Sequence, residues 1–194
     1  MSFKEKNLSD LPLSDLHLRE TCISSKDAYQ GNFLKMKKDI VSLPDGKETY
    51  REYLIHPGAV AIIPILNDGR ILLERQFRYP VDAAMIEIPA GKLEVGEDPL
   101  LCAKRELLEE TGYSATEWEY LGKIHPVISY STEIIEIFLA KGLEQGERCL
   151  DEGEFLDVFA ATLEEMHQWI AEGKITDVKT IIAVYHLSRR LKDR

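Results

Sequence analysis

Hydrophobic and polar positions along the chain predict short strands interleaved with a few helices. The most apolar run, residues 59–66, is typical of a buried strand, and Pro64 within it favours an edge strand or a bulge. An Asn67-Asp68-Gly69 turn leads from it into a second strand at residues 70–78. Four more strand-like stretches follow, at residues 85–88, 117–123, 133–140 and 155–160.

Three helices are predicted from their start and stop signals. Asp98 and Pro99 open the first, at residues 99–110, and Gly112 follows its end. The capping box Thr162-Leu163-Glu164-Glu165 opens the second, which Gly173 closes. The third spans residues 177–192 and ends in basic side chains. Strands interleaved with few helices place the chain in the α+β class, with mixed sheets.

The N-terminal part of the chain predicts a small antiparallel sheet. Residues 33–41 are expected to be extended, and the turn Leu43-Pro44-Asp45-Gly46 connects them to a strand at residues 48–55. Such a small sheet makes a poor core of its own, so it is expected to pack on something else. We therefore predict two domains, an N-terminal sheet at residues 1–57 and a main domain at residues 58–194.

Composition narrows the classes of partner. The chain has 194 residues, with 24 Lys and Arg against 34 Asp and Glu, and a formal net charge of −10. This acidity argues against nucleic-acid binding and against docking on an anionic membrane. No signal-peptide pattern and no bilayer-spanning apolar stretch is found, and the three cysteines are widely separated. These features predict a cytoplasmic protein.

The first predicted helix carries an acidic cluster. Glu106, Glu109 and Glu110 are spaced at i, i+3 and i+4, so they share one face, while Leu100, Leu101, Leu107 and Leu108 are expected to share another. Like charges at this spacing destabilise a helix, but a hard divalent cation such as Mg²⁺ binds carboxylate oxygens and reverses that effect. For three glutamates alone, a solvated acidic face is the competing interpretation.

The surrounding residues complete a longer pattern. Gly91, five residues, Glu97, seven residues and then Arg105-Glu106-Leu107-Leu108-Glu109-Glu110-Thr111-Gly112 reproduce every fixed position of the Nudix box. Seven matched Gly, Glu and Arg positions arise by chance at roughly 10⁻⁸ or less per start point. The chain therefore resembles the Nudix hydrolases. The resemblance implies an α/β/α sandwich with a mixed sheet, preceded here by the small N-terminal antiparallel sheet.

Segments outside the box look like the ADP-ribose pyrophosphatase branch, namely residues 74–81 and 87–91 and the N-terminal sheet. This resemblance implies a homodimer that hydrolyses the diphosphate bond of ADP-ribose or a related nucleoside diphosphate sugar, with Mg²⁺ or Mn²⁺ as cofactor. The products would be a nucleoside monophosphate and a sugar phosphate. Ile128-Ser129 stands where the branch commonly has proline and glycine. A GDP-mannose-type pyrophosphatase and a non-catalytic nucleotide sensor therefore stay open as alternatives.

The resemblance also implies roles for individual residues. The expected metal ligands are the carbonyl of Ala90 and the side chains of Glu106, Glu110 and Glu154. The expected catalytic residues are Glu152 as general base, Glu109 and Arg105. The acidic loop that holds Glu152 and Glu154 has a solvated turn as its competing interpretation. Structural roles in the box fall to Gly91, Glu97 and Gly112.

Substrate contacts are expected from residues in both predicted domains. A guanidinium offers paired donors to phosphate, which makes Arg78 a candidate. By the resemblance, Arg51 and Phe33 of the N-terminal sheet would reach the base across a dimer interface, and Glu133 would reach the terminal ribose. The five histidines are scattered without ligand spacing, so no transition-metal site is expected.

Overall fold

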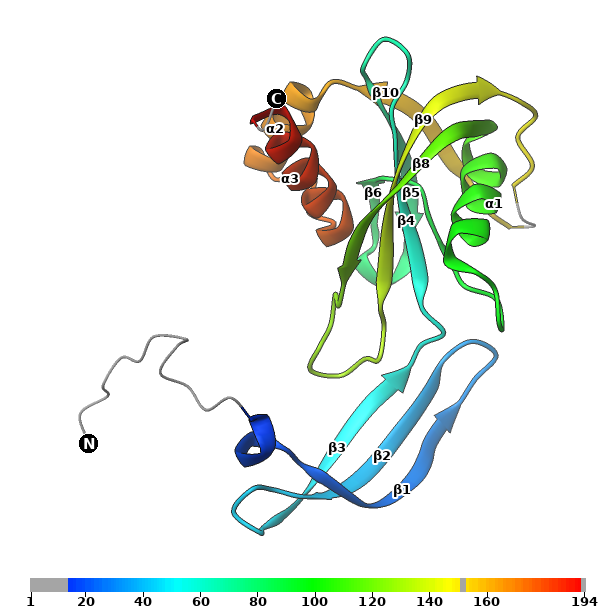
Figure 1. Ribbon diagram of the computed structural model, residues 1–194. Coiled ribbons are helices and arrows are strands. Elements are labelled where there is room, and N and C mark those ends of the chain that lie inside the picture. Colours follow the sequence, from blue (N-terminus) through cyan, green and yellow to red (C-terminus); the bar gives the residue numbers. More distant parts are fainter. Residues whose placement is uncertain (1–13, 151–152, 193–194) are drawn as a thin grey trace. The chain divides into compact units, whose positions relative to one another are not determined.

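The computed structural model describes residues 14–150 and 153–192 (Figure 1). Contacts between residues divide the chain into two compact units. The smaller unit holds the N-terminal part up to Ile55 together with Ser129–Ser131, and the larger unit holds the remainder. The box pattern at residues 91–112 therefore lies wholly within the larger unit.

The smaller unit contains an antiparallel sheet with the order β1-β2-β3. A short 3-10 helix precedes it, and its strands are β1 (Thr21–Gln30), β2 (Lys35–Ser42) and β3 (Glu48–Ile55). The predicted turn between β2 and β3 is present, with the N–H of Gly46 donating to the carbonyl of Leu43 at 2.9 Å. The hydrophobic pattern does not predict β1, because all its side chains are exposed and most are polar.

The larger unit contains two sheets. One has the order β7-β4-β9-β8 and the other the order β10-β5-β6. The β4 and β9 strands pair in parallel and the other pairs are antiparallel, so the first sheet is mixed. The strands are β4 (Ala59–Pro64), β5 (Ile71–Arg78), β6 (Ala83–Glu87), β7 (Ala90–Lys92), β8 (Tyr113–Ile124), β9 (Ile135–Gln145) and β10 (Leu156–Ala161).

Three α-helices form where the capping signals predict them. They are α1 (Pro99–Thr111), α2 (Leu163–Ala171) and α3 (Val178–Lys192). The Asp98 side chain accepts from the N–H groups at the start of α1, and Gly112 ends it at φ 75°, a conformation that favours glycine. The reciprocal bonds of the capping box between Thr162 and Glu165 are present at α2. Within the described residues, no helix has an apolar stretch that would reach across a membrane.

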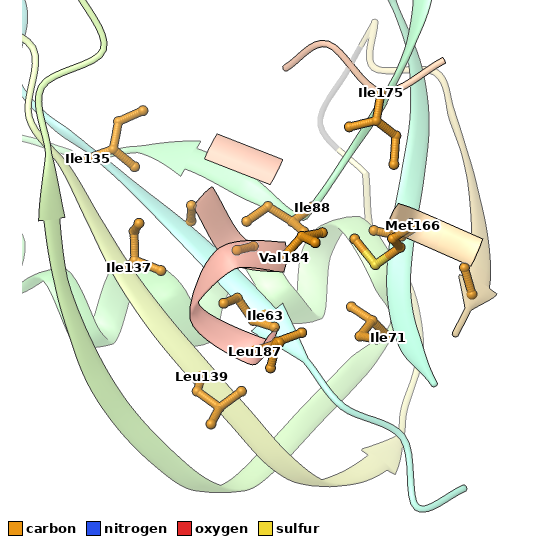
Figure 2. Packing of buried hydrophobic residues seen from close by; sticks show 14 of the residues in the cluster. Ile63, Ile71, Ile88, Ile135, Ile137, Leu139, Met166, Ile175, Val184 and Leu187 are labelled. Carbon is orange, nitrogen blue, oxygen red and sulfur yellow. The ribbon is translucent and has the colours of Figure 1, made fainter. Parts of the chain in front are cut away.

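The sheets of the larger unit are covered by α1 on one side and by α2 and α3 on the other (Figure 1). Alternate residues of β4 point to opposite faces: Ala61 and Ile63 join a core with α2 and α3, whereas Val60 and Ile62 join a core with α1. Figure 2 shows the first core, where Ile63 lies among β9, α2 and α3 side chains. This arrangement confirms the predicted α/β/α sandwich, and burial on both faces explains the unbroken apolar run.

Pro64 marks neither an edge strand nor a bulge, contrary to expectation, because β4 has neighbours on both sides and its register with β9 is unbroken. Its strand β4 lies between β7 and β9, but β7 pairs only with Ala59–Ala61. The N–H of Ile62 points to the β7 side, where it donates to Pro89, and the N–H of Ile65 points to β9. Position 64 faces the same side as Ile62, beyond the end of β7. Proline lacks an N–H, and none of the described strands is present there to accept one, so no ladder hydrogen bond is lost.

The Asn67-Asp68-Gly69 turn does not join a hairpin. The N–H of Gly69 donates to the carbonyl of Leu66 at 2.9 Å, so the turn itself is present. However, β4 and β5 belong to different sheets, and pairing across the turn is limited to the isolated bridge between Ile65 and Ile71 and a hydrogen bond from the N–H of Leu66 to the carbonyl of Arg70 at 2.8 Å. Turn chemistry is local, whereas the choice of partner strand is set by the two helix-facing cores.

Candidate active site

Helix α1 turns one of its glutamates into the protein interior. Its buried side chains are Cys102, Ala103, Leu107, Glu110 and Thr111, and Glu110 is only 3% exposed. The expected apolar face is wrong in part, because Leu101 and Leu108 are exposed. Cys102 and Ala103 are small, so this face of α1 packs closely against the sheet. Glu110 lies on the same face and is therefore buried.

Glu110 is held by the backbone of the neighbouring strand β7. Its Oε2 accepts a hydrogen bond from the N–H of Ala90 at 3.1 Å. Burial raises the pKa of Glu110 well above its usual value, and the negative charges of Glu74, Glu106 and Glu154 raise it further. The structure thus gathers four carboxyl groups whose charges repel one another.

Arg105 ties the loop before α1 to the glutamates on the helix. Its Nε and Nη2 each donate to the carboxylate of Glu97 at 3.0 Å, and its Nη1 donates to Glu106 at 2.9 Å and to Glu109 at 3.0 Å. The hydrogen bonds from Arg105 lower the pKa of Glu97 to about 2. Glu97 also accepts from the N–H of Glu94 at 2.9 Å. The pair therefore fixes the loop against the helix.

Gly91 leaves the space that the Glu106 side chain occupies. A Cβ atom built at Gly91 would overlap the carboxyl carbon and Oε1 of Glu106. The backbone of β7 consequently approaches the carboxylate more closely than any other residue would permit. Glycine is required at this position by space, since its φ lies outside the left-handed region.

With Glu106 as the expected metal ligand, Gly91→Ala is predicted to lower metal affinity and turnover by about 10–100-fold, the range seen when the groups that orient a metal ligand are changed. The added methyl group must push the carboxylate of Glu106 away. Gly146→Ala is the matched control, because a Cβ there meets only ordinary contacts, the nearest at 3.5 Å from Leu108. Mn²⁺ titration and steady-state kinetics of both variants check this, and equal behaviour of the two would contradict it.

Glu74 is a site residue that the sequence analysis did not select. It is 2% exposed, its side chain hydrogen-bonds to Glu110, and burial raises its pKa. Its Oε1 has no hydrogen-bond partner among the described residues. The available signal was a lone carboxylate that follows the buried residues Ile71–Leu73 in strand β5.

A second charged group surrounds Glu87, which pairs with Glu74 across the strands β5 and β6. The Nε and Nη2 of Arg78 donate to the two oxygens of Glu87 at 2.7 and 2.9 Å. Lys179 of α3 donates to the same carboxylate. Burial raises the pKa of Glu87, but Arg78 and Lys179 outweigh that effect and leave the pKa below its usual value. Glu87 is therefore held as an anion.

The remaining predicted residues are distributed over both units. Glu154 is half-buried, and its charge raises the pKa of Glu106 and Glu110, so it lies near the box. Glu133 precedes β9, with its Oε1 3.6 Å from the Nε2 of His56. Arg51 and Phe33 belong to the smaller unit, where Arg51 donates to Glu20 at 2.9 Å. Glu152 lies outside the described residues.

The donor chemistry of the larger unit fits a hard divalent cation. Carboxylates from α1 and β5 are buried together, and one oxygen of Glu74 lacks a partner among the residues that the structure covers. Within those residues, no three His, Cys, Asp or Glu side chains form a ready metal cluster. Mg²⁺ does not need one, because it is commonly held by one or two carboxylates together with water and substrate phosphates.

Two family models match this chain. The NUDIX domain model matches residues 55–181. The chain belongs to the Nudix family. The model of the nucleoside diphosphate sugar hydrolase N-terminal domain matches residues 20–54 of this Nudix protein, which include β1, β2 and nearly all of β3. The exposed strand β1 is thus part of a family domain.

Known relatives agree with this assignment. This Nudix protein is 44% identical over 170 residues to the methanol dehydrogenase activator of Bacillus methanolicus, covering 87% of this chain and 92% of the relative. It is 38% identical over 172 residues to the ADP-ribose pyrophosphatase of Bacillus subtilis strain 168, covering 88% and 93%. A crystal structure of an ADP compounds hydrolase shares the fold, with a TM-score of 0.81 at 22% identity over 91% of this chain and 96% of that one. The chain is a Nudix nucleoside diphosphate sugar hydrolase, similar to the ADP-ribose pyrophosphatases.

Proposed function

We propose that this Nudix hydrolase cleaves the diphosphate bond of ADP-ribose or a closely related nucleoside diphosphate sugar, and requires Mg²⁺ or Mn²⁺. The observation that carries the proposal is the buried pair of Glu110 and Glu74, whose mutual repulsion a divalent cation bound by Glu110 would relieve. The 38% identity to an ADP-ribose pyrophosphatase supports this choice of substrate. The products would be a nucleoside monophosphate and a sugar phosphate.

The cation would be held by Glu106, Glu110, Glu154 and the carbonyl of Ala90. When bound, it would neutralise phosphate charge and activate the attacking water. The hydrogen bond from Ala90 to Glu110 supports this assignment, because it places the Ala90 backbone beside the carboxylate. Arg105 would keep Glu106 and Glu109 in place through its own hydrogen bonds.

Proton transfer and substrate binding fall to other residues. Glu152 would accept the proton of the attacking water, since the box carboxylates would be engaged with the cation. Arg78 would contact the diphosphate, because its guanidinium is partly exposed and holds Glu87 with only one edge. Glu133 would contact the terminal ribose. Water adds to one phosphorus of the diphosphate, the bond from that phosphorus to the bridging oxygen breaks, and the half of the substrate that carries the other phosphate leaves.

A homodimer built through the N-terminal sheet is part of the proposal. All ten residues of β1 are exposed, and apolar side chains such as Ile23 and Tyr29 are among them. Exposed apolar surface on a sheet favours association with another chain. In such a dimer, Phe33 and Arg51 of one protomer would contact the nucleotide bound by its partner.

We expect ADP-ribose to be cleaved at least about tenfold more efficiently than GDP-mannose, because a site built to hydrogen-bond one substrate rejects an analogue that leaves its polar groups unpaired. The test incubates the protein with Mg²⁺ and ADP-ribose, GDP-mannose, NADH, diadenosine polyphosphates or nucleoside triphosphates, and follows the release of monophosphates by chromatography. A preference for GDP-mannose would favour that alternative and trace to the Ile128-Ser129 departure. Binding of ADP-ribose without cleavage would favour the sensor.

A regulatory role is a second candidate, favoured by the 44% identity to a methanol dehydrogenase activator. The two roles are separable with one variant. If Glu110→Gln, added to a methanol dehydrogenase, still raises the activity of that enzyme, the effect does not depend on hydrolysis. If only the unmodified protein does so, activation acts through the Nudix site.

A further inference from the structure

The start of α3 is bonded to the end of β6 by a chain of buried polar groups. The N–H of Ile88 donates to the hydroxyl of Thr180 at 2.9 Å, and that hydroxyl donates to Asp177 at 2.6 Å. The Nζ of Lys179 lies 3.1 Å from the same Asp177 carboxylate and donates to Glu87. Two consecutive residues of the strand side, Glu87 and Ile88, are thus held by three residues of the helix side.

Glu87 in turn fixes the guanidinium of Arg78. Two parallel hydrogen bonds define both the position and the plane of the guanidinium. They use the Nε proton and one Nη2 proton, so three of the five N–H groups are left for a ligand. The Arg78 side chain is 42% exposed, whereas that of Glu87 is 5% exposed. The buried carboxylate of Glu87 thus holds one edge of the Arg78 guanidinium, and the other edge faces solvent.

Lys179 itself cannot meet a substrate, because its side chain is only 10% exposed and its ammonium group is engaged by Glu87 and Asp177. A buried ion pair is weak evidence for stability, since the cost of desolvation offsets the attraction. The ion pair between Lys179 and Glu87 instead fixes the orientation of the Glu87 carboxylate, which stays directed at Arg78 on β5. Without Lys179, the carboxylate would have Arg78 as its remaining cationic partner among the described residues.

We propose that Lys179 is a positioning residue for substrate binding, which acts through Glu87 to hold the guanidinium of Arg78 in the orientation that receives the diphosphate. This rests on the proposed function, in which Arg78 contacts the substrate. The start of α3 would thereby shape the substrate site through Lys179, which is itself buried and paired with Glu87 and Asp177.

The test is a double-mutant cycle on steady-state kinetics with Mg²⁺ and ADP-ribose. We expect Lys179→Met to raise KM about tenfold or more, because a charge-assisted bond to the phosphate is misaligned, and to change kcat by less than about threefold. Lys179→Arg is expected to restore KM to within about threefold of the unmodified protein, since it keeps the charge. In a protein that already carries Arg78→Met, Lys179→Met should change KM by less than about twofold.

Full additivity of Lys179→Met with Arg78→Met would overturn the proposal, as would a loss of kcat and melting temperature at constant KM. Glu87→Gln is the second variant should Lys179→Met fail to fold. It keeps the size of the side chain and must show the same rise in KM and the same non-additivity. If the protein binds ADP-ribose without cleaving it, the cycle is measured on Kd by calorimetry. If another compound of the substrate panel is cleaved, the cycle uses that substrate. Failure of the proposed function is thereby distinguished from failure of the role assigned to Lys179.

Discussion

Replacing Glu110 with glutamine is expected to lower turnover of the Nudix hydrolase by about 10²–10³-fold, because a cation ligand supplies several kcal/mol of charge stabilisation in phosphoryl chemistry. The amide keeps the size of the side chain and can still accept the hydrogen bond from Ala90. The fold is therefore expected to be retained. Steady-state kinetics at saturating Mg²⁺ and Mn²⁺, together with Mn²⁺ titration, measure the loss and assign it to the cation.

The matched control for this variant is Glu144→Gln. Glu144 is an exposed glutamate of β9 in the same unit, and it carries the same change of charge. It should retain turnover within about twofold, since exposed substitutions seldom perturb a site. Near-normal activity of Glu110→Gln, or an equal loss in both variants, would refute the assignment of Glu110 as a ligand.

The melting temperature of the metal-free protein is expected to fall as pH rises from about 5 to about 8. The pKa values of Glu110 and Glu74 are raised by burial, so the folded state binds protons that the unfolded state has lost. Stability from these groups is present below the unfolded pKa and is lost as pH rises above it. Carboxylates with lowered pKa values, such as Glu97 and Glu87, vary with pH only below this range.

Saturating Mg²⁺ should oppose that fall, raising the melting temperature by about 5–10 °C at the higher pH and by less at the lower pH. The pKa of His186 is lowered, so its contribution to stability rises with pH, opposite to that of the buried glutamates. Comparing melting temperatures with and without Mg²⁺ separates the two contributions. Glu110→Gln should flatten the pH dependence of the metal-free protein. Scanning calorimetry in EDTA and in Mg²⁺ measures both effects, and a Mg²⁺ increment independent of pH would contradict the prediction.

The sequence predicts the helices and the Nudix fold well because their signals are local. Caps at Asp98, Gly112 and Thr162 act within a few residues, and the fixed spacing of the box identifies the family without knowledge of any tertiary contact. The pairing of strands is harder to predict from the sequence. The partners of β4 lie at residues 90 and 135 onward, and no local turn specifies them.

The candidate site shows the same division. Residues within the box follow from spacing, whereas Glu74 becomes visible only when β5 lies beside α1, and Lys179 only when α3 lies beside β6. A lone carboxylate in an apolar strand and a lysine near a helix start are common in proteins, so neither is selective by itself. The spacing of the glutamates on α1 also does not predict which of them faces the interior. The packing of Cys102 and Ala103 against the sheet decides that Glu110 does.

The bond between Ile88 and Thr180 closes a loop of 92 residues, and the bond between Glu87 and Lys179 spans the same separation. Closing such a loop costs about 4 kcal/mol in chain entropy, so these contacts form only when many others form with them. During synthesis, α3 leaves the ribosome well after the Nudix box, because it follows residues 91–112 in the chain. The positioning of Arg78 through Lys179 and Glu87 would therefore be completed later than the box, and a nascent chain would carry an intact Nudix box before it could orient a substrate.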